Sequence, residues 1–139
     1  MVRINLINPR CLTDQHLIAE YVEILMLFGS VNNLSDDIPK DYRLGQGHIK
    51  FFKNKLGYLK KRHELLKKEM IKRKFNHRKS INLKKFKNKL INDWKPTKKD
   101  KDIIKKRLME KINLKPSFYR YYGKHKSKKF LLDLIRKCN

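Results

Sequence analysis

Cysteine is scarce in this 139-residue chain, and its two copies, Cys11 and Cys138, lie at opposite ends. Their spacing matches no metal-ligand pattern, and no pair of histidines has such a spacing either, so we expect neither a metal nor another cofactor. We also expect no structural disulfide, which favours an intracellular location. The N-terminal residues lack the apolar stretch of a secretory signal, so we do not expect a secreted protein.

Long apolar runs and acidic residues are lacking too. No run approaches the roughly 18 residues of a membrane span, and no lipidation motif is present, so we expect no membrane association. The 13 acidic residues face 37 Lys and Arg, which gives a formal net charge of +24. Such a charge attracts a polyanion, usually nucleic acid. Only 9 of the basic residues are arginines, the better readers of base edges, so we expect contacts mainly to phosphates.

The spacing of the apolar residues indicates an all-α fold. We expect one compact domain over 1–139, built from about three main helices. These helices are predicted at about 15–28, 48–74 and 98–113. No strand pattern of useful length is visible.

Two further segments have a less regular pattern. Residues 77–92 form a variable, lysine-rich segment, in which we predict a short surface helix. Residues 125–139 form a C-terminal extension, in which Ser127 is placed to cap a final helix.

The first predicted helix is apolar around most of its circumference. Besides its main apolar face it has a second stripe at Ile18, Val22 and Met26, so we expect it to be largely buried. Glu20 and Glu23 lie on the remaining polar strip. A carboxylate on a largely buried helix is informative, and for Glu20 a structural ion pair is the favoured interpretation.

Three blocks of sequence, in this order, match one known family. The first extends from Arg3-Ile4-Asn5-Leu6 to Phe28-Gly29. The second extends from Leu44-Gly45-Gln46-Gly47-His48 to Phe75-Asn76, and the third from Arg107-Leu108 to Tyr119-Arg120-Tyr121-Tyr122-Gly123-Lys124. In these blocks the chain resembles the bacteriophage-type pyrimidine-dimer DNA glycosylases, which are also abasic-site lyases.

This resemblance implies a three-helix domain with its N-terminal segment threaded between the helices. It also implies a minor-groove approach to DNA, a flipped nucleotide, excision of the damaged base, and cleavage through an imine on the N-terminal α-amine. The catalytic groups would be the α-amine of Val2, once Met1 is removed, and the carboxylate of Glu23. The family's DNA-binding surface matches Arg3, Gln15, His16, Arg107 and Lys111.

The chemistry of these groups agrees with the roles that the family implies. An imine requires a neutral amine, and an α-amine with a pKa near 7.8 is roughly 10–15% neutral at pH 7, whereas a lysine is below about 0.1%. Glu23 would stabilise positive charge at the sugar C1′ and then assist proton removal. The alternative for Glu23 is a salt bridge to Arg3 or a lysine. For His16 it is an ordinary hydrogen-bonding role.

The segment from Tyr119 to Lys124 interleaves aromatic and basic side chains, as surfaces that stack on bases do. We expect Tyr119, Arg120 and Lys124 to contact nucleic acid. Some of the aromatic side chains of this segment should instead pack on the core.

The chain also departs from the family pattern. Val22 and Met26 stand where the family has arginines. We therefore expect weak or absent excision of pyrimidine dimers. The function that we expect overall is that of a monomeric DNA-repair glycosylase and lyase that acts on double-stranded damaged or abasic DNA. The alternative is a non-catalytic nucleic-acid-binding relative, such as a packaging or ribonucleoprotein component.

Overall fold

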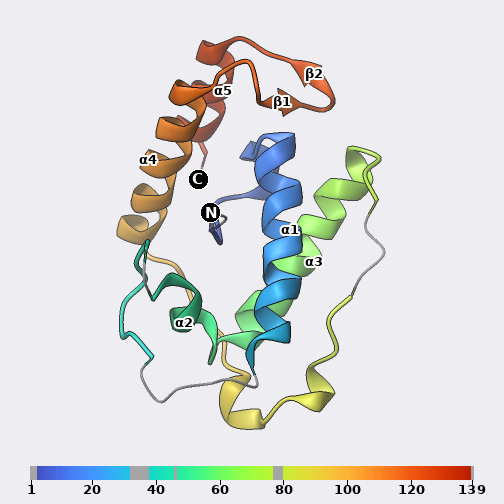
Figure 1. The fold of residues 1–139 in the computed structure, drawn as a ribbon, viewed down its shortest axis with the longest axis vertical. Helices are drawn as coiled ribbons and strands as arrows, with labels where there is room; N and C mark the ends of the chain where they lie inside the picture. The colour runs from blue at the N-terminus through green and yellow to red at the C-terminus, as the bar shows by residue number, and fades with distance from the viewer. Residues whose placement is uncertain (1–2, 32–37, 46, 77–79, 139) are drawn as a thin grey trace.

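The computed structural model describes residues 3–31, 38–45, 47–76 and 80–138. Within these residues the chain is mainly helical, as predicted. The elements are α1 (Asp14–Gly29), α2 (His48–Phe52), α3 (Leu56–Lys72), α4 (Lys98–Leu114), β1 (Arg120–Tyr121), β2 (Lys124–His125) and α5 (Lys128–Arg136). Helix α1 packs against α3, helix α5 packs against α4, and the N-terminal segment lies between α1 and α4 (Figure 1).

The predicted helix starts are confirmed by their capping hydrogen bonds. The side chain of Thr13 accepts a hydrogen bond from the backbone N–H of His16 at 3.2 Å at the start of α1. At the start of α4, Thr97 and Asp100 form the reciprocal capping box. The Ser127 hydroxyl accepts from the backbone N–H three residues later and starts α5 in the C-terminal extension.

The helix predicted over 48–74 is in fact two helices. It is interrupted between α2 and α3, where Lys55 leaves the helical conformation with φ −124° and ψ 43°. The ammonium group of Lys55 donates to the carbonyl of Phe51 at 2.9 Å and satisfies an acceptor at the end of α2. Phe51 and Phe52 pack on Trp94 at ring distances of 5.0 and 5.7 Å, so tertiary contacts hold α2 in its own direction.

The prediction of a surface helix within 77–92 is wrong for the residues of this segment that the structure describes, 80–92. Residues 80–92 contain two isolated 3-10 turns, Leu83–Lys85 and Asn88–Leu90. Ile81 and Leu90 are buried, Leu83, Phe86 and Ile91 are partly buried against the core, and the lysines of 80–92 face solvent. These apolar side chains reach the core from a largely irregular backbone, so tertiary packing overrides the helical spacing of the sequence.

A small hairpin corrects the expectation that no strands would form. Strands β1 and β2 pair antiparallel through a turn in which Tyr122 and Gly123 both have positive φ, 53° and 76°. The Asp14 carboxylate accepts hydrogen bonds from the backbone N–H groups of both turn residues, at 3.0 and 2.7 Å. Two-residue strands are too short to produce an alternating sequence pattern, and a distant carboxylate holds the turn.

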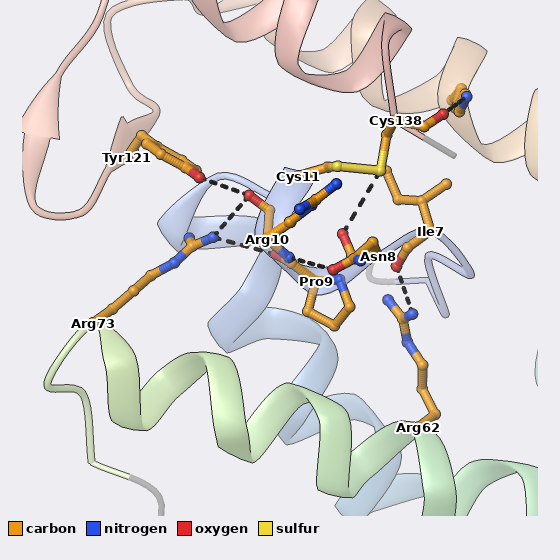
Figure 2. The surroundings of a disulfide bond; sticks show 10 residues. Ile7, Asn8, Pro9, Arg10, Cys11, Arg62, Arg73, Tyr121 and Cys138 are labelled. Atoms are coloured by element: carbon orange, nitrogen blue, oxygen red, sulfur yellow. Dashed lines mark hydrogen bonds between the residues drawn. A yellow bond between two sulfur atoms is a disulfide. The ribbon is translucent and has the colours of Figure 1, made fainter.

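The N-terminal segment is threaded through the interior. Ile4, Ile7 and Leu12 are fully buried. Two buried arginines of the α3 region hold its backbone, as Figure 2 shows in part: Arg62 donates to the carbonyl of Ile7, and Arg73 donates to Leu12 O at 2.8 Å. Buried carbonyls need such partners where no helix or strand supplies them.

These arginines are themselves balanced by carboxylates. Arg62 forms a bidentate ion pair with the fully buried Glu20, with N–O distances of 2.7 and 3.0 Å. The predicted structural role of Glu20 is therefore confirmed. Arg73 pairs with Asp14 at 3.0 Å and with Glu69 at 2.8 Å. Because Asp14 also holds the hairpin turn, one ion-pair network connects the N-terminal segment, α3 and the hairpin.

The expectation of no disulfide is wrong. Cys11 and Cys138 are bonded across 127 residues of sequence, with a Cα–Cα distance of 6.1 Å (Figure 2). The packing of α5 on α4 brings the C-terminal end against the N-terminal segment. Sequence distance gives no information about such an approach.

The second apolar stripe of α1 also differs from expectation. Ile18, Val22 and Met26 are 39%, 45% and 65% exposed, although a largely buried helix was predicted. The reason is that α3 and the N-terminal segment cover the other sides of α1. No helix within the described part of the chain is long and apolar enough to cross a membrane.

Candidate nucleic-acid interface

A pocket of about 350 Å³ opens between the N-terminal segment, the first turns of α1 and the C-terminal half of α4. Six of the predicted nucleic-acid-binding residues line it together, although they come from distant parts of the sequence. These are Arg3, Gln15, His16, Arg107, Lys111 and Tyr119. The structure therefore gathers most of the predicted surface at one place.

His16 forms one wall of this pocket. Its ring stacks on Tyr119 with centroids 4.6 Å apart and planes 23° apart, and its Nδ1 lies 2.9 Å from the Thr13 hydroxyl oxygen. Burial, followed by the charges of Arg107 and Lys111, lowers the pKa of His16 to about 4. His16 is therefore neutral at pH 7 and offers a flat, polar-edged surface rather than a charge.

The positive charge of the pocket comes from Arg3, Arg107 and Lys111. Burial lowers the pKa of Arg107, and the neighbouring charge of Arg3 lowers it further. Even so lowered, a guanidinium stays protonated at neutral pH. Like charges held close together repel one another, and a bound anion would relieve this repulsion.

Three pocket residues were not among the sequence-predicted site residues: Asn5, Ala19 and Phe118. Asn5 is only 2% exposed, and its Oδ1 has no hydrogen-bond partner within the described residues. A buried polar atom without a partner is costly, which makes this oxygen a candidate acceptor for a ligand. Asn5 belongs to the first matching block, but no spacing rule marked it as functional.

Glu23 lies two turns beyond His16 on α1, outside the residues that line the pocket. Residues seven apart share a helix face, so Glu23 lies on the side of α1 that carries His16. Its side chain is partly buried. Burial raises the pKa of the Glu23 carboxyl, and the charge of Arg3 opposes that shift. Val2, the predicted nucleophile, lies outside the described residues.

Arg120 and Lys124 do not line the pocket. Both side chains are exposed on the hairpin. The backbone N–H of Arg120 instead donates to the Gln15 side-chain oxygen at 2.9 Å and so orients a pocket residue. Within the described chain, no group of three or more His, Cys, Asp or Glu side chains is placed to hold a metal ion.

A helical fold with a cationic, aromatic-lined pocket defines a class of basic proteins suited to binding nucleic acid. A family model, pyrimidine dimer DNA glycosylase, matches residues 1–83 of the 139, more than half of the chain. The chain therefore belongs to the pyrimidine dimer DNA glycosylase family, which confirms the resemblance drawn from the sequence. The match includes Arg3, Gln15, His16 and Glu23 and ends before α4.

Proposed function

We propose that this protein is a DNA-repair glycosylase that also cleaves abasic sites, with the α-amine of Val2 as its nucleophile. The observation that carries the proposal is the pocket. It gathers Arg3, Gln15 and His16 from the family-matched region with Arg107 and Lys111 from α4. A site of this charge and shape suits the phosphodiester backbone around a damaged nucleotide.

The pocket also suits a nucleotide that has left the base stack. Its volume of about 350 Å³ falls within the range of small-molecule sites. A neutral His16 stacked on Tyr119 supplies a flat surface, and Asn5 Oδ1, which has no hydrogen-bond partner among the described residues, supplies an acceptor. Extrusion of a nucleotide costs a few kcal/mol, which such contacts would offset.

The roles of the two catalytic groups follow from their protonation. The neutral fraction of the Val2 α-amine attacks the sugar C1′. At a damaged nucleotide this attack breaks the N-glycosidic bond and releases the base, and opening of the sugar ring gives an imine; at an abasic site the amine adds to the C1′ aldehyde, and loss of water gives the same imine. The attack requires that Met1 be removed, because otherwise the α-amine belongs to Met1, one residue before Val2. Glu23 stabilises positive charge at C1′ and then accepts a proton from C2′, and elimination breaks the C3′–O bond and expels the 3′ phosphate, which cleaves the strand. Partial burial with an elevated carboxyl pKa suits a group that must accept a proton.

The preference for one type of lesion follows from two positions of α1, Val22 and Met26, where the family has arginines. Opening a duplex at a pyrimidine dimer needs contacts that hold a kinked backbone, and Val22 and Met26 offer no positive charge there. An abasic site has already lost its base and deforms more readily. We therefore expect efficient cleavage at abasic sites and weak or absent excision of dimers.

Borohydride trapping on abasic-site DNA tests the nucleophile. Reduction during the reaction should fix a covalent complex, and peptide mapping should place it on the residue that begins the mature chain. Acetylation of that amine should abolish trapping, while single lysine substitutions such as Lys111→Gln should still allow it. Trapping that survives acetylation would assign the nucleophile to a side chain. Tight DNA binding without cleavage of either substrate would favour a non-catalytic relative.

A further inference from the structure

The exposed apolar side chains of α1 lie beside the pocket. Successive residues of a helix are rotated by 100°, so Met26 is about 20° and Val22 about 60° from Ala19, which lines the pocket. Met26 is about 10 Å farther along the helix axis than Ala19. Val22 and Met26 therefore lie along one edge of the pocket-facing strip of α1, and Glu23, about 40° from Ala19 in the opposite sense, lies along the other. Ile18, at about 100° from Ala19, lies outside this strip.

These two side chains are conspicuous because of their surroundings. They are 45% and 65% exposed in a chain with a formal net charge of +24. The pocket beside them is lined by Arg3, Arg107 and Lys111. The cations would bring a polyanion to this face, but an apolar side chain gains nothing from contact with a phosphate. It gains from contact with the faces of bases and with deoxyribose carbons.

Such surfaces become accessible where a duplex is damaged. When a base is missing or extruded, the neighbouring bases lose a stacking partner, and apolar side chains such as methionine can fill the gap. Resting on the function proposed above, we propose that Val22 and Met26 form an apolar wedge. This wedge packs into the gap in the opened strand and sets the preference of the protein for damaged over intact duplex.

The test is equilibrium binding to two duplexes of equal length, one intact and one with a tetrahydrofuran abasic analogue. The analogue has no C1′ hydroxyl and forms no imine. The double variant Val22→Ser, Met26→Ser should lose about tenfold of the preference for the analogue, because two apolar contacts are removed. The salt dependence of binding should stay unchanged, since no charge is altered. With the double variant, a 2-aminopurine placed beside the analogue should show less unstacking than with the wild-type protein.

Two controls make the result specific. Ile71→Ser removes an apolar side chain of α3 that is 53% exposed and outside the pocket lining, and it should leave the preference unchanged. Val22→Ile, Met26→Leu keeps the strip apolar and should retain the preference. An unchanged preference in the double serine variant would overturn the wedge, as would a wild-type protein that binds both duplexes equally. Because the analogue forms no imine, failure of the trapping experiment would refute the proposed chemistry and leave this test valid.

Discussion

The Cys11–Cys138 disulfide provides a prediction about stability that follows from the fold alone. The bond closes a loop of 127 residues, the sequence separation of the two cysteines. In the chain-entropy description, a closed loop of that length lowers the conformational entropy of the unfolded state, which raises the free energy of unfolding by about 5 kcal/mol. Measured losses for native disulfides are about 2–5 kcal/mol, so this figure is the upper end of the expected effect.

The loss converts into a shift of the melting temperature. An unfolding entropy of about 2.1 cal/mol/K per residue gives roughly 0.29 kcal/mol/K for 139 residues, so each kcal/mol corresponds to about 3.4 °C. Reduction of the disulfide should therefore lower Tm by about 7–17 °C, measured by circular dichroism with and without a thiol reductant. The variant Cys11→Ala, Cys138→Ala is the matched control and should melt low in both conditions. Equal melting of oxidised and reduced wild type would refute this reasoning.

Three further predictions concern catalysis, binding and pH. Glu23→Gln keeps size but removes the charge, so DNA affinity should stay within a few-fold while abasic-site turnover falls at least about 10²-fold; unchanged turnover would return Glu23 to a salt-bridge role. If about six phosphates are neutralised, the log–log salt slope of binding should be near −5, and a binding constant that is equal at about 50 and 200 mM salt would exclude phosphate-dominated binding. Burial lowers the pKa of His63 to about 4, below its unfolded value near 6.5, so its contribution to stability is complete above about pH 6.5 and is lost as pH falls toward 4. His63→Phe, which keeps the stack on Tyr21, should make the pH dependence of urea unfolding between pH 7 and 5 less steep. Burial also lowers the pKa values of His16 and His48 to about 4, so these two residues keep part of the dependence, and an equally steep dependence in the variant would contradict the role of His63.

Much of the candidate site could be predicted from the sequence, and the reason differs between residues. His16 and Glu23 belong to a periodic helix with a recognisable cap, so local spacing already placed them on one side of α1, whereas Gln15 was assigned by resemblance to the family. Arg107 and Lys111, on another helix, were assigned by resemblance to a family, and the pocket now places them with the residues of α1. Their meeting depends on how α4 packs, which no local pattern encodes.

Asn5 and Phe118 show where sequence reasoning stops. Asn5 lies in an irregular segment, where no periodicity indicates which side chains face a cavity. Its importance comes from a buried oxygen that finds no hydrogen-bond partner in the part of the chain that the structure describes. Phe118 is 57% exposed yet lines the pocket, a combination that only the position of the loop before β1 produces.

The sequence by itself determined the helical class, the starts of α1, α4 and α5, the excess of positive charge and the structural role of Glu20. These properties depend on residue spacing, on local hydrogen-bond donors and acceptors, and on composition. Only the tertiary structure decided the bond between Cys11 and Cys138 and the exposure of Val22 and Met26. Both depend on which surfaces meet in space: α5 is brought to the N-terminal segment, and the apolar flank of α1 is left uncovered beside a cationic pocket. Contacts between segments far apart in the chain leave no periodic trace in the sequence, so packing alone determines them.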